Sequence, residues 1–176
     1  MKQGLKTSLA LFVIALICGA LLAGVNYFTA PEIERAKSEK VAALLSEFYS
    51  QEDGYLFDED TTSKKEKYIN NIYLVKKDGV VVAHVYATST YGYSGGELQM
   101  LVAIEKDGLT IKGMKLVQAD ADRLGGKFAS ILSGVEGTGL TEFEDNLVWN
   151  AGVTVSTKAV EDALKKVLKQ ASTLLG

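Results

Sequence analysis

The sequence contains a single cysteine and a single histidine, and each scarcity removes a class of site. Cys18 lies inside an apolar run near the N-terminus, so the residues after that run can form neither a disulfide nor a cysteine-ligated metal site. A histidine-rich metal centre is excluded because His84 stands alone. The residues around His84 have a strand pattern, and we interpret it as a strand residue rather than a catalyst.

Acidic residues outnumber basic ones after Ala30. Residues 31–176 carry all 22 acidic residues and 17 of the 19 basic ones, which gives them a formal charge of −5. Proteins that bind nucleic acid need a basic face. The composition therefore argues against nucleic acid as a partner.

One long apolar run stands near the N-terminus. From Leu9 to Val25 every residue is apolar or small, and Tyr27 and Phe28 follow. With its flanks the run reaches about 20 residues, enough for a helix to cross ~30 Å of hydrocarbon. A secretory signal usually has a shorter apolar region and a small-residue cleavage site, and the bulky residue before Cys18 makes a poor lipoprotein processing site. We therefore predict an uncleaved transmembrane anchor with aromatic residues at its interface.

The charges that flank this run predict its orientation. Lys2 and Lys6 precede it, and no acidic residue does. The positive-inside rule then places the N-terminus in the cytoplasm and everything after Ala30 outside it. The expected protein is single-pass in the cell (inner) membrane, with an extracytoplasmic C-terminal domain.

The sole proline, Pro31, predicts a helix boundary. Thr29 can cap and Pro31 can start a new helix, whose apolar stripe continues over 32–49. Residues 51–67 are polar and charged, as in a solvated loop. The predicted organisation is a membrane anchor at 1–30, a connecting helix and loop at 31–67, and a domain at 68–176.

The domain should be α+β, with an antiparallel sheet and flanking helices. Strand patterns at 68–75 and 80–87 flank a Lys-Asp-Gly turn, and those at 98–104 and 109–117 flank a second one. From Thr157 onward apolar residues recur at helical spacing. We predict a final amphipathic helix that packs on the sheet.

Two glycine-rich segments are candidate ligand contacts. In "YGYSGGELQMLVAI" (91–104) three glycines allow the backbone to approach a ligand closely, although a flexible turn explains them too. In "RLGGKF" (123–128) a glycine pair precedes Lys127, which can meet a phosphate or an anionic ring edge. The alternative there is a loop that starts a helix.

The segment "NAGVTVSTKAV" (150–160) precedes the final helix. Ser156 and Thr157 are both good N-cap residues, so a capped helix is one interpretation. The other is an anion site, because free N–H groups and the helix dipole favour a phosphate there, beside the Thr154 hydroxyl. No base for serine-type catalysis is identifiable nearby, so Thr154 is not expected to act as a turnover nucleophile.

In combination these segments resemble the FMN-binding domain family. The resemblance is to the RnfG component of the Rnf ion-translocating electron-transport complex, and the corresponding flavoprotein component of the sodium-translocating NADH:quinone reductase is similar. The shared order is an N-terminal anchor, "GYSGGELQMLVAIEKDG", "LGGKFA", and "AGVTVST" leading into a final helix. The resemblance covers most of the chain and is strongest over 91–170.

The resemblance implies a covalent flavin. The last threonine of the family's terminal motif carries FMN through a phosphoester bond, installed by a flavin transferase, and that position is Thr154 here. The family's aspartate, serine and alanine fall on Val148, Ala151 and Val153. Tyr91, Tyr93 and Trp149 are possible neighbours of the flavin ring. The other expected cofactor contacts are Gly152, Val153, Val155, Ser156, Thr157, Tyr93, Gly95, Leu124, Gly125 and Lys127.

The implied function is electron relay in an Rnf-type ferredoxin–NAD oxidoreductase that translocates ions. The protein would exchange electrons through FMN without binding NAD itself, and its partners would be other membrane subunits and the transferase. Two alternatives remain. One is a cofactor-free structural or assembly subunit that keeps the fold, and the other is a free-standing extracellular electron-transfer flavoprotein.

Overall fold

The computed structural model describes residues 2–107, 109–119, 132–139, 142–147 and 154–175. The chain divides into two compact units, Met1–Lys40 and Val41–Gly176. The sequence predicts divisions after residues 30 and 67, and these stay a prediction. The second unit takes in the last turns of the first helix as well as the sheet.

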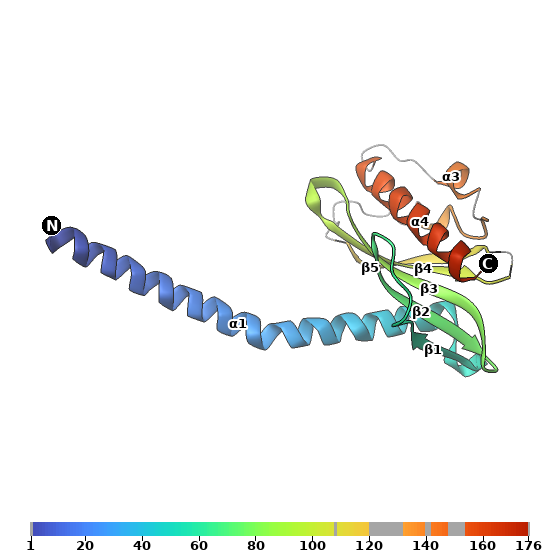
Figure 1. The fold of residues 1–176 in the computed structure, drawn as a ribbon, viewed down its shortest axis with the longest axis horizontal. Helices are drawn as coiled ribbons and strands as arrows, with labels where there is room; N and C mark the ends of the chain where they lie inside the picture. The colour runs from blue at the N-terminus through green and yellow to red at the C-terminus, as the bar shows by residue number, and fades with distance from the viewer. Residues whose placement is uncertain (1, 108, 120–131, 140–141, 148–153, 176) are drawn as a thin grey trace. The chain divides into compact units, whose positions relative to one another are not determined.

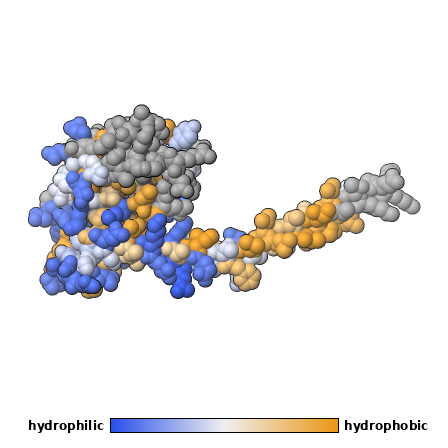
Figure 2. Space-filling model, turned by 180° about the vertical axis from the view of Figure 1, so that it is seen from behind, coloured by the Kyte–Doolittle hydropathy of each residue, from blue (hydrophilic) through white to orange (hydrophobic). Residues whose placement is uncertain are grey.

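The first unit is helical, and most of the side chains that the structure describes in it are exposed. It consists of α1, which spans Lys2–Phe48 and so continues into the second unit. Within the described ranges α1 is the one helix that is long and apolar enough to cross a membrane. Figure 2 shows a largely hydrophobic surface along the apolar stretch of this unit, followed by hydrophilic side chains. Tyr27 and Phe28 are both exposed, with ring centroids 5.6 Å apart, as expected of aromatic residues at a membrane interface.

The expected helix boundary at Pro31 is wrong, because α1 runs through it without a break. Proline lacks the N–H that would bond to the carbonyl one turn earlier, so the helix forgoes one hydrogen bond there. The Thr29 hydroxyl does not cap a new helix; it donates to the Val25 carbonyl at 2.9 Å. The apolar run before Pro31 and the amphipathic stretch after it therefore form a single helix.

The second unit contains a five-stranded sheet in which every neighbouring pair is antiparallel. Strand order follows sequence order, so each connection is local (Figure 1). The strands are β1 (Tyr55–Glu59), β2 (Ile69–Lys77), β3 (Val80–Tyr91), β4 (Glu97–Glu105) and β5 (Ile111–Ala119). Both predicted hairpins are confirmed, as is the α+β class.

The sequence predicts a solvated loop at 51–67, but the structure shows that this segment also contains regular elements. It holds the short 3-10 helix η1 (Gln51–Asp53) and the edge strand β1, in which Phe57 pairs with Val75 of β2. The sequence pattern does not predict β1 because the strand contains the charged residues Asp58 and Glu59. Such residues are tolerated here because β1 is an exposed edge strand. The ion pair between Asp58 and Lys76, 2.6 Å long, joins the two strands across their exposed side.

Helices cover both faces of the sheet. On one face α4 (Thr154–Leu174) packs through buried apolar residues such as Val160, Leu164 and Val167. On the other, the end of α1 packs through Leu45 and Phe48. Strand residues alternate between the two cores, and a short helix, α3 (Phe143–Asn146), adds to the α4 side. The predicted final helix is confirmed, and Figure 1 shows it lying along the sheet.

A buried polar group interrupts the core on the α4 side. His84 Nδ1 lies 3.2 Å from the Tyr86 hydroxyl, and both side chains are buried on β3. Burial lowers the pKa of His84; the nearby Asp60 carboxylate opposes this shift, and Lys106 adds to it. His84 is thus a strand residue, as the sequence predicts. Its burial favours the neutral form of the ring.

We expect stability to fall as the pH drops below the unfolded-state histidine value, about 6.5. Below that pH the histidine of the unfolded chain is protonated, whereas buried His84 of the folded chain stays neutral. The free energy of unfolding therefore falls by up to ~1.4 kcal/mol per pH unit. The stabilisation is therefore present above that pH and is lost as the pH falls towards the lowered folded value. Urea midpoints at pH 7.5 and 5.5, for the parent and His84→Asn, measure this. An equal loss in both proteins would contradict the assignment.

Candidate functional site

The turn that joins β3 to β4 folds back on itself tightly. It contains the 3-10 helix η2 (Tyr93–Gly95), and the Gly92 N–H donates to the Gly96 carbonyl at 2.8 Å. Gly95 has φ +75°, in the left-handed region where an L side chain is strained. The glycines predicted to approach a ligand thus first serve the turn itself.

This turn packs against the beginning of α4. The Tyr93 N–H donates to the Ser156 hydroxyl at 3.2 Å, although the two residues are far apart in sequence. A Cβ on Gly92 would lie 2.7 Å from Ser156 Oγ and 3.0 Å from Leu98 Cδ1, so only glycine fits. Ser156 is fully buried. We call this contact of Gly92, Tyr93 and Ser156 the turn–helix latch.

Gly92→Ala should lower the free energy of unfolding by about 1–3 kcal/mol, the usual result of overpacking a filled site. The clash lies with a buried hydroxyl and a buried leucine methyl, so relief requires the turn to move away from α4. Gly139→Ala is the matched control, because a Cβ there meets nothing within 4 Å. Chemical denaturation of both variants tests the turn–helix latch. Equal denaturation midpoints for Gly92→Ala and Gly139→Ala would show that the turn can move away from α4 at no cost in stability.

The first turn of α4 begins with an exposed threonine. Thr154 opens the helix and is exposed, and Val155 is 55% exposed. The first turn contains no acidic residue, so no carboxylate of its own neutralises the positive end of the helix dipole. The first N–H groups of a helix lack intrahelical acceptors. An anion is therefore favoured here, with Thr154 Oγ1 next to it.

Ser156 and Thr157 do not cap α4, so that prediction is wrong. The helix already includes Thr154, and both residues lie inside its first turn with buried side chains. Ser156 uses its hydroxyl for the latch instead of a backbone N–H of its own helix. A tertiary contact with the turn has displaced the local one that the sequence favoured.

The structure joins two of the three segments that the sequence singled out. Tyr93 and Gly95 belong to the turn, and Thr154, Val155, Ser156 and Thr157 to the helix that it touches. Tyr91 and Tyr93 are large exposed side chains at this end of the sheet. The remaining expected contacts lie outside the described residues: Gly152, Val153, Leu124, Gly125, Lys127, and also Trp149.

Gly92 is one of the three glycines that the sequence singles out in 91–104, but it is not among the expected cofactor contacts. Its signal was present, since it is the first glycine of "YGYSGG". The packing against Ser156 that gives it a role appears only in three dimensions. In the ranges that the structure describes, no three His, Cys, Asp or Glu side chains are grouped to hold a metal.

The N-terminal region also resembles a known family. Residues 1–48 match the family model described as the RnfG N-terminal region, and no curated protein matches the chain. The matched stretch coincides with α1 and its apolar run, and together they support a single-pass, membrane-anchored protein. Through this region the chain resembles the RnfG component of the Rnf complex, which supports its assignment as an Rnf complex subunit.

Proposed function

We propose that this protein carries FMN, esterified to Thr154, and relays electrons within an Rnf-type complex. The observation that carries the proposal is the exposed residue Thr154 at the start of α4, in a first turn without acidic residues. A phosphoester at this hydroxyl places the phosphate charge at the positive end of the helix. The match to the RnfG N-terminal region supports the part of the proposal that makes this protein a subunit of an Rnf-type complex.

Each described residue of the site has a distinct part in holding the cofactor. Thr154 Oγ1 would form the ester, and the N–H groups of the first helical turn would be available to the phosphate. Ser156 and Gly92 fix the turn against the helix, which keeps the exposed Tyr93 at the same end of the domain. Bound FMN would supply the redox chemistry, while these residues supply position and electrostatics.

Attachment through a covalent bond suits the expected location of the domain. The charges around the apolar run favour an orientation with the residues after Ala30 outside the cytoplasm, where a dissociated cofactor would be lost. A single-pass anchor would hold the flavin near the membrane subunits with which it exchanges electrons. The flavin transferase is then a partner in maturation.

The intact mass of the full chain, coexpressed with a flavin transferase, tests the proposal. We expect a gain of about 438 Da, the mass of FMN less one water. Peptide mapping should place the gain on the peptide that contains Thr154. An unchanged mass would favour the cofactor-free alternative instead, because Val148, Ala151 and Val153 replace the family's usual residues around the acceptor.

A further inference from the structure

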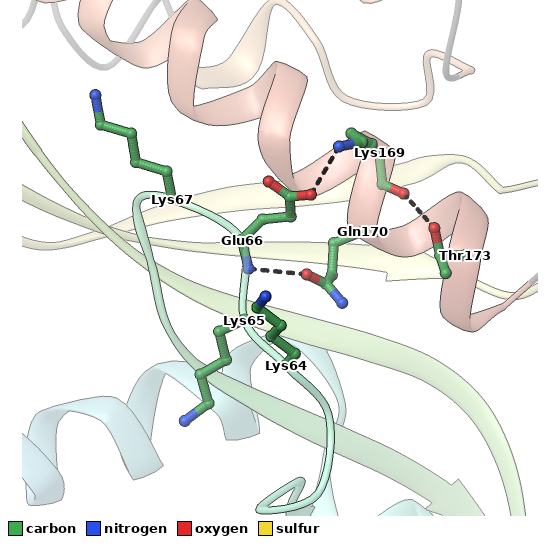
Figure 3. A pocket seen from close by; sticks show the side chains of 7 residues that line it. All are labelled: Lys64, Lys65, Glu66, Lys67, Lys169, Gln170 and Thr173. Atoms are coloured by element: carbon green, nitrogen blue, oxygen red, sulfur yellow. Dashed lines mark hydrogen bonds and ion pairs between the residues drawn. The ribbon is translucent and has the colours of Figure 1, made fainter.

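A basic hollow lies at the C-terminal end of α4, away from the proposed flavin site. Its volume is about 460 Å³, and it is lined by residues 64–67 and by the last turns of the helix (Figure 3). Four of the lining side chains are lysines: Lys64, Lys65, Lys67 and Lys169. We call this region the lysine hollow.

A buried glutamine holds the two walls of the hollow together. Gln170 is 6% exposed, and its Oε1 accepts a hydrogen bond from the Glu66 N–H at 3.0 Å. Glu66 also receives Lys169 Nζ at 2.7 Å, as Figure 3 shows. Two contacts therefore fix the segment 64–67 against α4, so its lysines project from an ordered support.

Neutral groups, rather than carboxylates, position the lysines of this segment. Lys65 Nζ donates to Asn71 Oδ1 at 2.9 Å, and Lys67 Nζ lies 4.6 Å from the centroid of the Tyr68 ring. Lys64, Lys65 and Lys67 form no ion pair with any residue that the structure describes. No described carboxylate therefore offsets these three lysines through an ion pair, and two of them are already oriented.

The hollow is strongly positive on a domain that is negative overall. Four lysines and one glutamate give it a formal charge of +3, against −5 for residues 31–176. The hydrogen bond from Lys169 lowers the pKa of Glu66, with smaller contributions from the charges of Lys169, Lys166 and Lys64. Glu66 therefore stays ionised and offsets only one of the lysines.

We propose that the lysine hollow binds an acidic segment of a partner protein. Its concave shape admits protruding aspartate or glutamate side chains, and four lysines line it. A flat anionic bilayer fits less well, since it cannot enter a hollow and would repel the rest of this acidic domain. The lysines are partly ordered in advance, which reduces the entropy that binding costs. The proposal does not depend on the flavin.

A labelled polyglutamate peptide, titrated against the full chain in neutral detergent at low salt, tests the proposal by fluorescence anisotropy. We expect saturable binding that weakens about tenfold in the triple variant K64Q/K65Q/K67Q, and that weakens further as salt rises. The matched control is K76Q/K112Q/K115Q, which removes the same charge. Those lysines each pair with a carboxylate, namely Asp58, Glu105 and Glu47, at 2.6, 3.1 and 2.9 Å. The control should bind as the parent does.

Equal weakening in both triple variants would overturn the proposal, because net charge rather than the hollow would then govern binding. A second measurement separates the lipid alternative. Hydrogen exchange at residues 64–67 is followed in nanodiscs of neutral lipid with the peptide, and in nanodiscs with phosphatidylglycerol without it. Protection by the peptide supports a protein partner. Protection by phosphatidylglycerol alone would overturn the proposal in favour of a lipid surface.

Discussion

Thr154→Ala, coexpressed with a flavin transferase, should show no in-gel flavin fluorescence after denaturation, whereas the parent chain fluoresces. The loss should be complete, because alanine offers no hydroxyl to form the ester. Thr154 is exposed at the start of α4, so its removal should leave the fold intact. An exposed substitution of this kind usually changes stability by less than about 0.5 kcal/mol. Circular dichroism of the variant checks that expectation.

Two further variants separate the acceptor from other hydroxyls on the same helix. Thr154→Ser keeps a hydroxyl and should retain some fluorescence. Thr173→Ala removes a hydroxyl at the far end of α4, where it donates to the Lys169 carbonyl at 3.0 Å, and should fluoresce like the parent. Fluorescence that persists in Thr154→Ala would show that another residue carries the flavin.

The parts of the fold that could be predicted are those that local sequence determines. Each of the two hairpins brings strands together across a short turn, so alternation and turn residues were sufficient. The helical spacing after Thr157 likewise predicted α4, since an amphipathic helix needs a face to bury. In these places the period of the apolar residues and the final packing agree.

The errors arose where a distant contact or a neighbouring element decides. Ser156 reads as a cap by local preference, but the backbone of Tyr93 occupies its hydroxyl. β1 reads as a solvated loop, but pairing with β2 orders it. Pro31 reads as a helix start, yet α1 continues through it as one helix. A single sequence does not reveal which of these local preferences tertiary structure overrides.

The candidate site shows the same limit at a finer scale. Taken separately, "YGYSGG" and "NAGVTVST" each have a plain explanation as a turn and as a helix start. The contact between Tyr93 and Ser156 makes them parts of one structure. The family resemblance had already grouped them, but the physical reason for the first glycine came only from its packing against Ser156.

Leu164→Ala should produce the largest loss of stability among simple core substitutions on α4. Leu164 is 1% exposed and belongs to the core between α4 and the sheet, so truncation leaves a cavity. Such changes cost about 2–5 kcal/mol, a large share of the ~5–15 kcal/mol that stabilises a typical domain. Urea unfolding of the full chain in neutral detergent, followed by circular dichroism, measures the shift.

Leu56→Ala is the matched control, because it makes the same chemical change at an edge-strand residue that is 63% exposed. Its midpoint should stay close to that of the parent, and equal losses in the two variants would mean that α4 does not seal the core. The pair also separates anchoring from stability. Without urea, folded Leu164→Ala still presents Thr154 at the start of α4, so it should accept flavin although it unfolds early. Thr154→Ala should do the opposite: it should fold as stably as the parent but accept no flavin. The two variants together would show that Thr154 serves flavin attachment and that Leu164 serves packing.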